Sequence, residues 1–325
     1  MDPDTADLRM FSGRSHPELA EEIAAYIGIP LEKTNFARFS NDNLFIQLGA
    51  SVRGRKVLVL QSLIPPVSEH ILELLMMLDI ARSAAASEVH AIIPYFSYAR
   101  SDKKNAPRIS ITARLIADLL QTAGATQVVT MTLHSPQVHG FFSVPTDPLT
   151  ARGLFVNHFV QQELNPKDTI VVAPDYGRAG SASRLAAQLG LTAISAEKKR
   201  ISDTEVLIGE LIGKQVAGFR RALIYDDEIA TGGSVVNLCG HLVENGVKEI
   251  SLICTHGLFI GKSLERIAAI PQVTEIVTTN TVPIPPEKRP PNMVVLSVGP
   301  IFAEAIRRNI SHQSIGDLFA FWDDR

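Results

Sequence analysis

The sequence of 325 residues is long enough for two ordinary domains, and with 46% hydrophobic and 20% charged residues it excludes a disordered chain. A net charge of −3 argues against a general nucleic-acid binder, and two cysteines in apolar surroundings provide neither a disulfide framework nor a metal site. The N-terminus has no signal-peptide pattern and no apolar run reaches membrane-spanning length, so we expect a cytoplasmic protein that engages neither nucleic acid nor membrane.

Short apolar runs alternate with amphipathic helical stretches along the chain. In the first half, the patterns predict strands at residues 45–48, 57–61, 89–95 and 128–133, and helices at 17–27, 70–85 and 111–123. In the second half, they predict strands at 169–173, 192–196, 222–225, 250–255, 275–279 and 293–297, and helices at 181–189, 234–245, 262–268, 301–308 and 314–321. This alternation is typical of an α/β fold with mainly parallel sheets and helices on both faces.

The two halves repeat one pattern. Residues 54–60 and 219–225 both place basic residues before an apolar strand, and each strand is followed by a helix and then by another strand. This repeat predicts duplication of one Rossmann-like α/β unit, with an N-terminal domain at 1–149 and a C-terminal domain at 150–325. We expect the seam near residues 145–152, and we expect part of 290–310 to return to the N-terminal domain.

The most informative stretch follows the predicted strand at residues 222–225. Asp226 and Asp227 come directly after this strand, where their oxygens can accept hydrogen bonds from sugar hydroxyls or hold Mg²⁺. A turn of small residues then opens a helix, and its members are Thr231, Gly232, Gly233 and Ser234. Free N–H groups and the helix dipole favour a phosphate there, and glycines let a ligand approach the backbone. The pattern predicts a seat for a phosphorylated sugar, against the alternative of a tight turn with solvated acids.

Two further strand ends carry chemically useful side chains. Asp175 stands between a predicted strand and a small-residue loop that opens a helix, where it is either a metal ligand or a helix cap. His134 follows the predicted strand at residues 128–133, where it is either a ligand or a partner of a loop carbonyl. The sequence alone leaves both pairs of alternatives open.

Two segments place cations near strand ends. Residues 96–104 combine aromatic rings with Arg100 and two lysines, which suits a nucleotide base and its phosphates, although a solvated basic loop has the same composition. Lys198 and Arg200 follow the predicted strand at residues 192–196 and lead into a long polar segment. Cations on such a segment can neutralise charge that builds up during phosphoryl transfer, whereas the alternative is a solvated surface run.

Together these motifs resemble the ribose-phosphate diphosphokinases, the enzymes that make phosphoribosyl diphosphate. The stretch at residues 222–236 is also similar to the corresponding loop of phosphoribosyltransferases, and by itself it does not separate the two families. The resemblance to the diphosphokinases runs nearly end to end and includes the segments at residues 38–40, 51–54, 93–100, 133–134, 140–142 and 302–306.

The resemblance implies two phosphoribosyltransferase-type domains and a reaction in which the anomeric hydroxyl of ribose 5-phosphate attacks the β-phosphorus of ATP, AMP leaves and Mg²⁺ is required. Ribose 5-phosphate would contact Asp226, Asp227, Thr231, Gly232, Gly233 and Ser234, and ATP would contact Phe39, Asn41, Asn43, Arg100, Ser101 and Asp102. His134 and Asp175 match the metal-binding pair, and Lys198 and Arg200 match the cations of the catalytic loop. Phe39 would reach into a neighbouring subunit's site, in a homo-oligomer built from dimers and commonly a hexamer.

Several positions depart from the family pattern. Ala230 stands where many diphosphokinases carry a third aspartate, and Arg178 stands where glycine is usual. Asn41 and Asn43 replace acidic residues near the adenine site, so strict ATP preference does not follow from the resemblance. Because of these departures together, phosphate activation and ADP inhibition do not follow from it either. A phosphoribosyltransferase and a catalytically silent regulatory paralogue are the alternative interpretations of the sequence.

Overall fold

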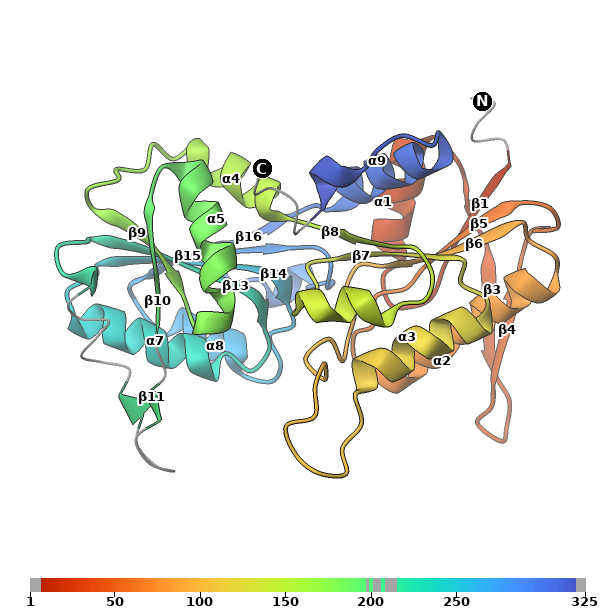
Figure 1. The fold of residues 1–325 in the computed structure, drawn as a ribbon, viewed down its shortest axis with the longest axis horizontal. Coiled ribbons are helices and arrows are strands. Elements are labelled where there is room, and N and C mark those ends of the chain that lie inside the picture. Colours follow the sequence, from red (N-terminus) through yellow and green to blue (C-terminus); the bar gives the residue numbers. More distant parts are fainter. Residues whose placement is uncertain (1–6, 197–198, 201–205, 208–214, 320–325) are drawn as a thin grey trace. The chain divides into compact units, whose positions relative to one another are not determined.

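The computed structural model describes residues 7–196, 199–200, 206–207 and 215–319 (Figure 1). Contacts between residues divide the chain into two compact units. Unit 1 extends to Thr150 and also contains Thr281–Pro283 and the chain from Ser297 onwards. Unit 2 contains Ala151–Asn280 and Ile284–Leu296, so the C-terminal part of the sequence returns to the first unit.

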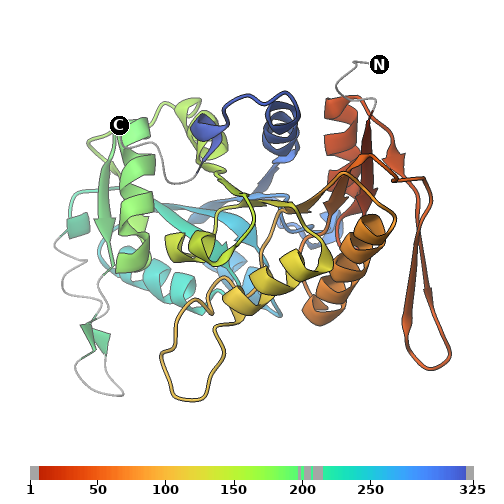
Figure 2. The same cartoon turned by 45° about the vertical axis from the view of Figure 1, so that its right-hand side comes forward.

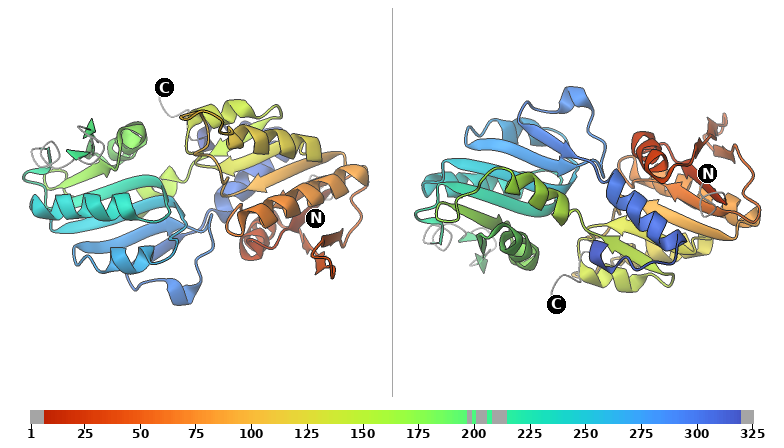
Figure 3. Two further views of the ribbon diagram at one scale, coloured as in Figure 1. Left: turned by 90° about the horizontal axis from the view of Figure 1, so that it is seen from below. Right: turned by 90° about the horizontal axis from the view of Figure 1, so that it is seen from above.

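The described part of unit 1 is built on a six-stranded parallel sheet in the order β2–β1–β5–β6–β7–β8. These strands are β1 (Leu8–Ser12), β2 (Leu31–Glu32), β5 (Lys56–Leu60), β6 (Glu88–Ile93), β7 (Gln127–Met131) and β8 (Thr146–Leu149). The helices are α1 (Pro17–Ile27), α2 (Val67–Ser83), α3 (Thr112–Ala123) and α9 (Gly299–Ile310), with α1 and α9 on one face of the sheet and α2 and α3 on the other (Figures 1 and 3).

The described part of unit 2 repeats this plan with the parallel order β10–β9–β13–β14–β15–β16. Its strands are β9 (Thr169–Ala173), β10 (Thr192–Ser195), β13 (Arg221–Ile229), β14 (Glu249–Gly257), β15 (Val273–Thr279) and β16 (Met293–Leu296). Helices α4 (Arg152–Val160) and α5 (Ala179–Leu189) cover one face, and α7 (Gly233–Glu244) and α8 (Ser263–Ala268) cover the other (Figure 3). A short antiparallel pair joins β11 (Lys199–Arg200) to β12 (Val206–Leu207).

Each sheet has one point at which the strand order reverses. In unit 1 the chain leaves β1 for β2 on one side and leaves β5 for β6 on the other, and in unit 2 the same reversal separates β9 from β13. Right-handed crossovers then place the helices before the reversal and those after it on opposite faces of the sheet. The loops that follow the two strands at a reversal therefore face each other across a crevice, which is where open α/β sheets bind ligands.

Buried apolar side chains give each unit its own core. In β5, the four residues from Val57 to Leu60 are fully buried, as expected for a central parallel strand covered by helices on both faces. The unit 2 core is formed in the same way, with Ile224 of β13 and Leu252 of β14 packed under Leu238 and Leu242 of α7. Across the described residues, no helix is long and apolar enough to cross a lipid bilayer.

One element of unit 1 stands outside its main sheet. Strands β3 (Thr34–Arg38) and β4 (Leu44–Leu48) pair antiparallel with each other and form a separate hairpin that extends away from the sheet (Figure 2). The loop at its tip spans residues 39–43 and is closed by hydrogen bonds from Phe39 N to Asn43 O at 2.9 Å and from Asp42 N to Phe39 O at 2.9 Å.

The predicted α/β fold with two similar, mainly parallel units is confirmed, whereas several predicted boundaries are wrong. Helix α2 begins at Val67 rather than at residue 70, and β7 ends at Met131 because Thr132 takes a φ of 44° that cannot continue a strand. In place of the helix predicted at residues 314–321, the described residues contain one 3₁₀ turn at Gly316–Leu318. Periodicity also missed β1, β8 and α4, because these elements are short or carry polar residues.

Candidate active site

The acidic pair of unit 2 lies inside a strand rather than after it, which corrects the predicted end at residue 225. Strand β13 continues to Ile229 because β14 keeps pairing with it, from Asp226 opposite Cys254 to Ile229 opposite Gly257. The pairing with β9 ends at Ile224. Beyond that residue β13 is flanked by β14 alone, so the acidic pair lies beside the strand-order reversal, where the neighbouring strand has already stopped.

The two carboxylates share a restricted environment. Asp227 is buried at 5% exposure, and Asp226 accepts a hydrogen bond from Asp227 N at 2.8 Å through its own side chain. Burial, and next the adjacent Asp227 carboxylate, raise the pKa of Asp226 well above its ordinary value. Burial also raises the pKa of the preceding Tyr225 to about 12. Two close carboxylates that are costly to ionise together are stabilised by donors such as hydroxyl groups or cations.

Arg178 supplies one such cation. Its Nε lies 3.6 Å from Asp227 Oδ1, and both side chains are largely buried. In the sequence, Arg178 stands out only as a departure from a family pattern. It lies three residues after Asp175 and far along the chain from Asp227, so no local pattern connects it with the acidic pair. The fold brings them together since the loop after β9 and the end of β13 flank the same reversal of strand order.

The turn after β13 has the geometry of a phosphate seat. Gly232 takes a φ of 72° and precedes the first residue of α7, and the amide of Val236 donates to Gly232 O at 2.9 Å. The first amides of a helix have no partner within it, so they point out of the helix end together with its positive dipole. Thr231 and Ser234 are exposed on either side of the two glycines. The predicted binding residues thus occupy one continuous connection between β13 and α7.

Asp175 caps the short turn Tyr176–Arg178, because its Oδ1 accepts a hydrogen bond from Arg178 N at 3.1 Å. Asp175 therefore acts as a cap, which is one of the two roles that the sequence left open, and its side chain is exposed. The metal role stays a prediction. His134 belongs to unit 1 and Asp175 to unit 2, and within the described part of the chain no three His, Cys, Asp or Glu side chains gather as a metal site.

The residues predicted to contact ATP lie on two separate segments of unit 1. Phe39 is 55% exposed in the hairpin loop, where its ring packs edge-on against Phe45 with centroids 5.7 Å apart, and Asn41 and Asn43 share this loop. Arg100, Ser101 and Asp102 follow β6, beside Tyr98 with its φ of 64°. The Ser101 hydroxyl accepts from Thr112 N at 3.2 Å and donates to Ser110 O at 3.2 Å.

Two predicted catalytic cations are placed only in part. Lys198 lies outside the described residues, and Arg200 is described through its backbone in β11.

His134 is half-buried two residues after Thr132, whose positive φ is uncommon for a β-branched side chain. Such backbone strain clusters at functional sites, and here it sets the direction in which the chain leaves β7.

We expect ionisation of the acidic pair Asp226 and Asp227 to make the folded protein less stable as the pH rises above the ordinary pKa of an aspartate. An unfolded aspartate has a pKa of about 3.9, whereas the pKa of Asp226 in the folded protein is raised. The loss of folding stability therefore begins as the pH rises above about 4 and is complete above the pKa of the folded state. We expect Asp226→Asn to raise Tm at pH 7.5 by roughly a few degrees and to change it little near about pH 4.

Thermal unfolding followed by circular dichroism measures this difference. Asp118→Asn is the matched control, because Asp118 is exposed on α3 and forms an ion pair with Arg114. Its replacement should not raise Tm at either pH. A lower Tm for Asp226→Asn at pH 7.5 would show that the carboxylate is well stabilised by its surroundings.

Comparison with known proteins places this geometry in a family. Residues 8–124 match the N-terminal domain of ribose phosphate pyrophosphokinase, and residues 207–320 match the phosphoribosyl synthetase-associated domain. A Streptomyces coelicolor protein is 49% identical over 96% of this chain and 98% of its own length. A ribose-phosphate pyrophosphokinase of Deinococcus radiodurans is 44% identical over 96% of this chain and 98% of its own.

A solved structure agrees with these sequence matches. The crystal structure of phosphoribosylpyrophosphate synthetase from Mycobacterium smegmatis superposes with a TM-score of 0.86 and 35% identity, covering 94% of this chain and 99% of that one. The similarity therefore extends over both units. This chain belongs to the ribose-phosphate pyrophosphokinase family.

Proposed function

We propose that this enzyme transfers the β,γ-diphosphoryl group of ATP to the C1 hydroxyl of ribose 5-phosphate, giving phosphoribosyl diphosphate and AMP. The observation that supports it most is the connection from β13 to α7, where an acidic pair and a phosphate seat follow each other at a strand-order reversal. Family membership over nearly the whole chain supports the same reaction. The reaction consumes cytoplasmic metabolites, so we place the enzyme in the cytoplasm.

Unit 2 would bind the sugar phosphate. The amides at the start of α7 and the hydroxyls of Thr231 and Ser234 would donate to the 5-phosphate, since a helix N-terminus favours an anion. Asp226 and Asp227 would accept hydrogen bonds from the ribose hydroxyls. This arrangement fixes the sugar at both ends and holds its C1 hydroxyl in one orientation, which is the main requirement of phosphoryl transfer.

Unit 1 would bind ATP. Phe39 presents an exposed ring suited to stacking on adenine, and Asn41 and Asn43 offer amide groups that both donate and accept hydrogen bonds. Arg100, Ser101 and Asp102 would contact the same nucleotide from the loop after β6. We assign residues 1–149 to the ATP side and the rest of the chain to the ribose 5-phosphate side, except Thr281–Pro283 and the chain from Ser297 onwards, which belong to unit 1. A dimer-based homo-oligomer, commonly a hexamer, would let the hairpin serve a neighbouring subunit's site.

The residues present fit a magnesium ion. Asp175 uses Oδ1 as a cap, so its second carboxylate oxygen is geometrically able to bind a hard cation, and the side chain is exposed. His134 would complete the pair from unit 1. Bound Mg²⁺ would neutralise charge on the ATP phosphates. Asp175 would hold the ion while its cap keeps the loop after β9 in place.

Mixing the protein with ATP, Mg²⁺ and ribose 5-phosphate tests the proposal, with AMP and phosphoribosyl diphosphate measured by chromatography. We expect both products in equal amounts. Failure of a folded preparation to release AMP would contradict the proposal. Consumption of phosphoribosyl diphosphate with a nucleobase would instead identify a phosphoribosyltransferase, and activity that appears only after adding a related subunit would identify a regulatory paralogue.

A further inference from the structure

Unit 1 has its own strand-order reversal, between β1 and β5. The loops that leave these strands contain residues 13–16 and 61–66, and they correspond in topology to the loops of unit 2 that carry Asp175 and the acidic pair. By the rule for open α/β sheets, the crevice between them is the expected ligand position of unit 1. None of the nucleotide contacts proposed above lies on these loops.

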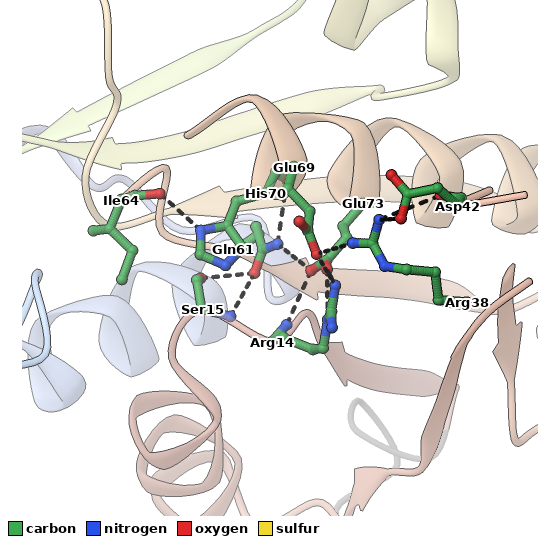
Figure 4. Close-up of polar contacts among 9 residues, drawn as sticks. All are labelled: Arg14, Ser15, Arg38, Asp42, Gln61, Ile64, Glu69, His70 and Glu73. Carbon is green, nitrogen blue, oxygen red and sulfur yellow. Dashed lines mark hydrogen bonds and ion pairs between the residues drawn. The ribbon is translucent and has the colours of Figure 1, made fainter. Parts of the chain in front are cut away.

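In unit 1 this crevice is filled by the protein's own side chains (Figure 4). Gln61 is fully buried, and its Oε1 accepts from Ser15 N at 3.1 Å and from Ser15 Oγ at 2.7 Å. Its Nε2 donates to Glu73 Oε2 at 2.8 Å and to His70 O at 3.2 Å. The Ser15 hydroxyl also accepts from Ser62 N at 2.8 Å. These contacts tie the two loops together and leave the crevice closed.

An ion pair between the buried Glu73 and the exposed Arg14 lies next to these contacts. The Glu73 side chain is fully buried, and its carboxylate accepts from Arg14 Nε at 2.6 Å and from Gln61 Nε2 at 2.8 Å. The backbone N of Arg14 donates to the same carboxylate at 3.3 Å. A buried carboxylate that is paired and hydrogen-bonded from several sides has one arrangement, because any loss leaves an uncompensated charge. Glu73 therefore holds Arg14 through both its backbone N and its Nε, although the Arg14 side chain is 43% exposed.

From this ion pair, charges of alternating sign lead outward to the hairpin. Arg14 also forms an ion pair with Glu69 in the first turn of α2. Glu69 in turn lies 2.8 Å from an Arg38 nitrogen, and Arg38 contacts Asp42 at 2.6 Å (Figure 4). The hydrogen bond with Arg38 is the leading cause that lowers the pKa of Glu69. A chain of four ion pairs thus joins the closed crevice to the hairpin loop, and it runs from Glu73 through Arg14, Glu69 and Arg38 to Asp42.

The base of the hairpin has contacts of its own, one of which also involves Arg14. Ile46 of β4 is buried in the unit 1 core, and the Arg14 guanidinium lies 5.5 Å from the centroid of the Phe36 ring. Among the residues that the structure describes, none provides a comparable apolar anchor for the tip, since Phe39 and Phe45 are both exposed. Arg38 is the last residue of β3 and the neighbour of Phe39, so its contacts with Glu69 and Asp42 set where the loop points.

We propose that Glu69 and Arg38 are positioning residues that fix the hairpin loop for ATP, using the closed ligand crevice of unit 1 as their anchor. This inference rests on the proposed function, because that function assigns ATP binding to the loop that carries Phe39, Asn41 and Asn43. Exposed ion pairs contribute little to stability, so the contribution of this pair lies in orientation rather than in folding. A misplaced binding loop weakens binding without removing any group that touches the nucleotide.

Glu69→Gln tests the proposal, because Glu69 lies on α2 rather than in the loop. We expect the KM for ATP to rise about three- to tenfold, with kcat and the KM for ribose 5-phosphate within about twofold of wild type. Hydrogen exchange at the amides of Phe39 and Asp42, which close the loop, should be faster while Tm is unchanged. Glu69→Asp keeps the charge and should restore part of the ATP affinity.

Arg114→Gln is the matched control, since it removes an exposed arginine from the ion pair with Asp118 on α3, away from the hairpin. It should leave every measured quantity at the wild-type value. If Glu69→Gln has wild-type exchange and a wild-type KM for ATP, the positioning role is wrong. Faster exchange with an unchanged KM for ATP would equally overturn it. Absence of AMP release by the wild-type enzyme would instead overturn the proposed function, and the exchange measurement would still report on the anchor.

Discussion

Replacing Arg200 with alanine is expected to lower kcat by about 30- to 900-fold, which corresponds to a loss of about 2–4 kcal/mol of transition-state stabilisation. Lys198→Ala is expected to act in the same range. Charge on the transferred phosphoryl group grows as the reaction proceeds, and a cation that meets it only at that point raises the rate without tightening substrate binding. We therefore expect the affinity for ribose 5-phosphate to change by less than about threefold.

Steady-state kinetics with either substrate varied, together with calorimetric titration of ribose 5-phosphate, separate the two effects. Lys248→Ala provides the control, because Lys248 is exposed at the amino end of β14, the edge of the sheet opposite the proposed site. It should leave kcat unchanged. Equal losses in turnover and in ribose 5-phosphate affinity would mean that Lys198 and Arg200 bind substrate and have no special role in the transfer.

Gly232→Ala is expected to raise the KM for ribose 5-phosphate at least about tenfold. A β-carbon at this position would lie 2.5 Å from the Oγ of the buried Ser263 and 3.3 Å from Ile267 of α8, and the φ of 72° disfavours any side chain. The turn must shift to relieve both problems. Because the proposed phosphate donors are backbone amides of this turn, their shift moves the phosphate seat itself.

Gly246→Ala separates strain from displacement. Gly246 follows the other end of α7, has a φ of 97°, and a β-carbon added there would meet no atom within 4 Å. This variant therefore carries the same kind of backbone strain without a clash. It should lower Tm but leave the KM for ribose 5-phosphate unchanged. A similar rise in KM for both variants would show that loss of stability, rather than movement of the turn, weakens binding.

The connection from β13 to α7, which we propose binds the sugar phosphate, was predictable because its parts are close in sequence. An apolar strand, Asp226 and Asp227, two glycines and a helix follow within a few residues, and each part has a local physical signal. The alternation of strands and helices likewise predicted the parallel α/β units, since a helical or extended period depends only on neighbouring residues. The exact end of β13 was not predictable, because pairing with β14 extends it through charged residues.

The sequence by itself therefore determined the fold class, the repeat of one α/β unit and the local order of acidic pair, glycine turn and helix. Only the tertiary structure decided how Arg178 meets Asp227, and how Arg14 reaches a carboxylate 59 residues away to anchor the hairpin. The strand-order reversal is the physical reason in both units, because it brings together loops that are distant in the chain. In unit 2 these loops leave an acidic strand end beside the proposed phosphate seat, and in unit 1 the same position is closed by Gln61 and Glu73.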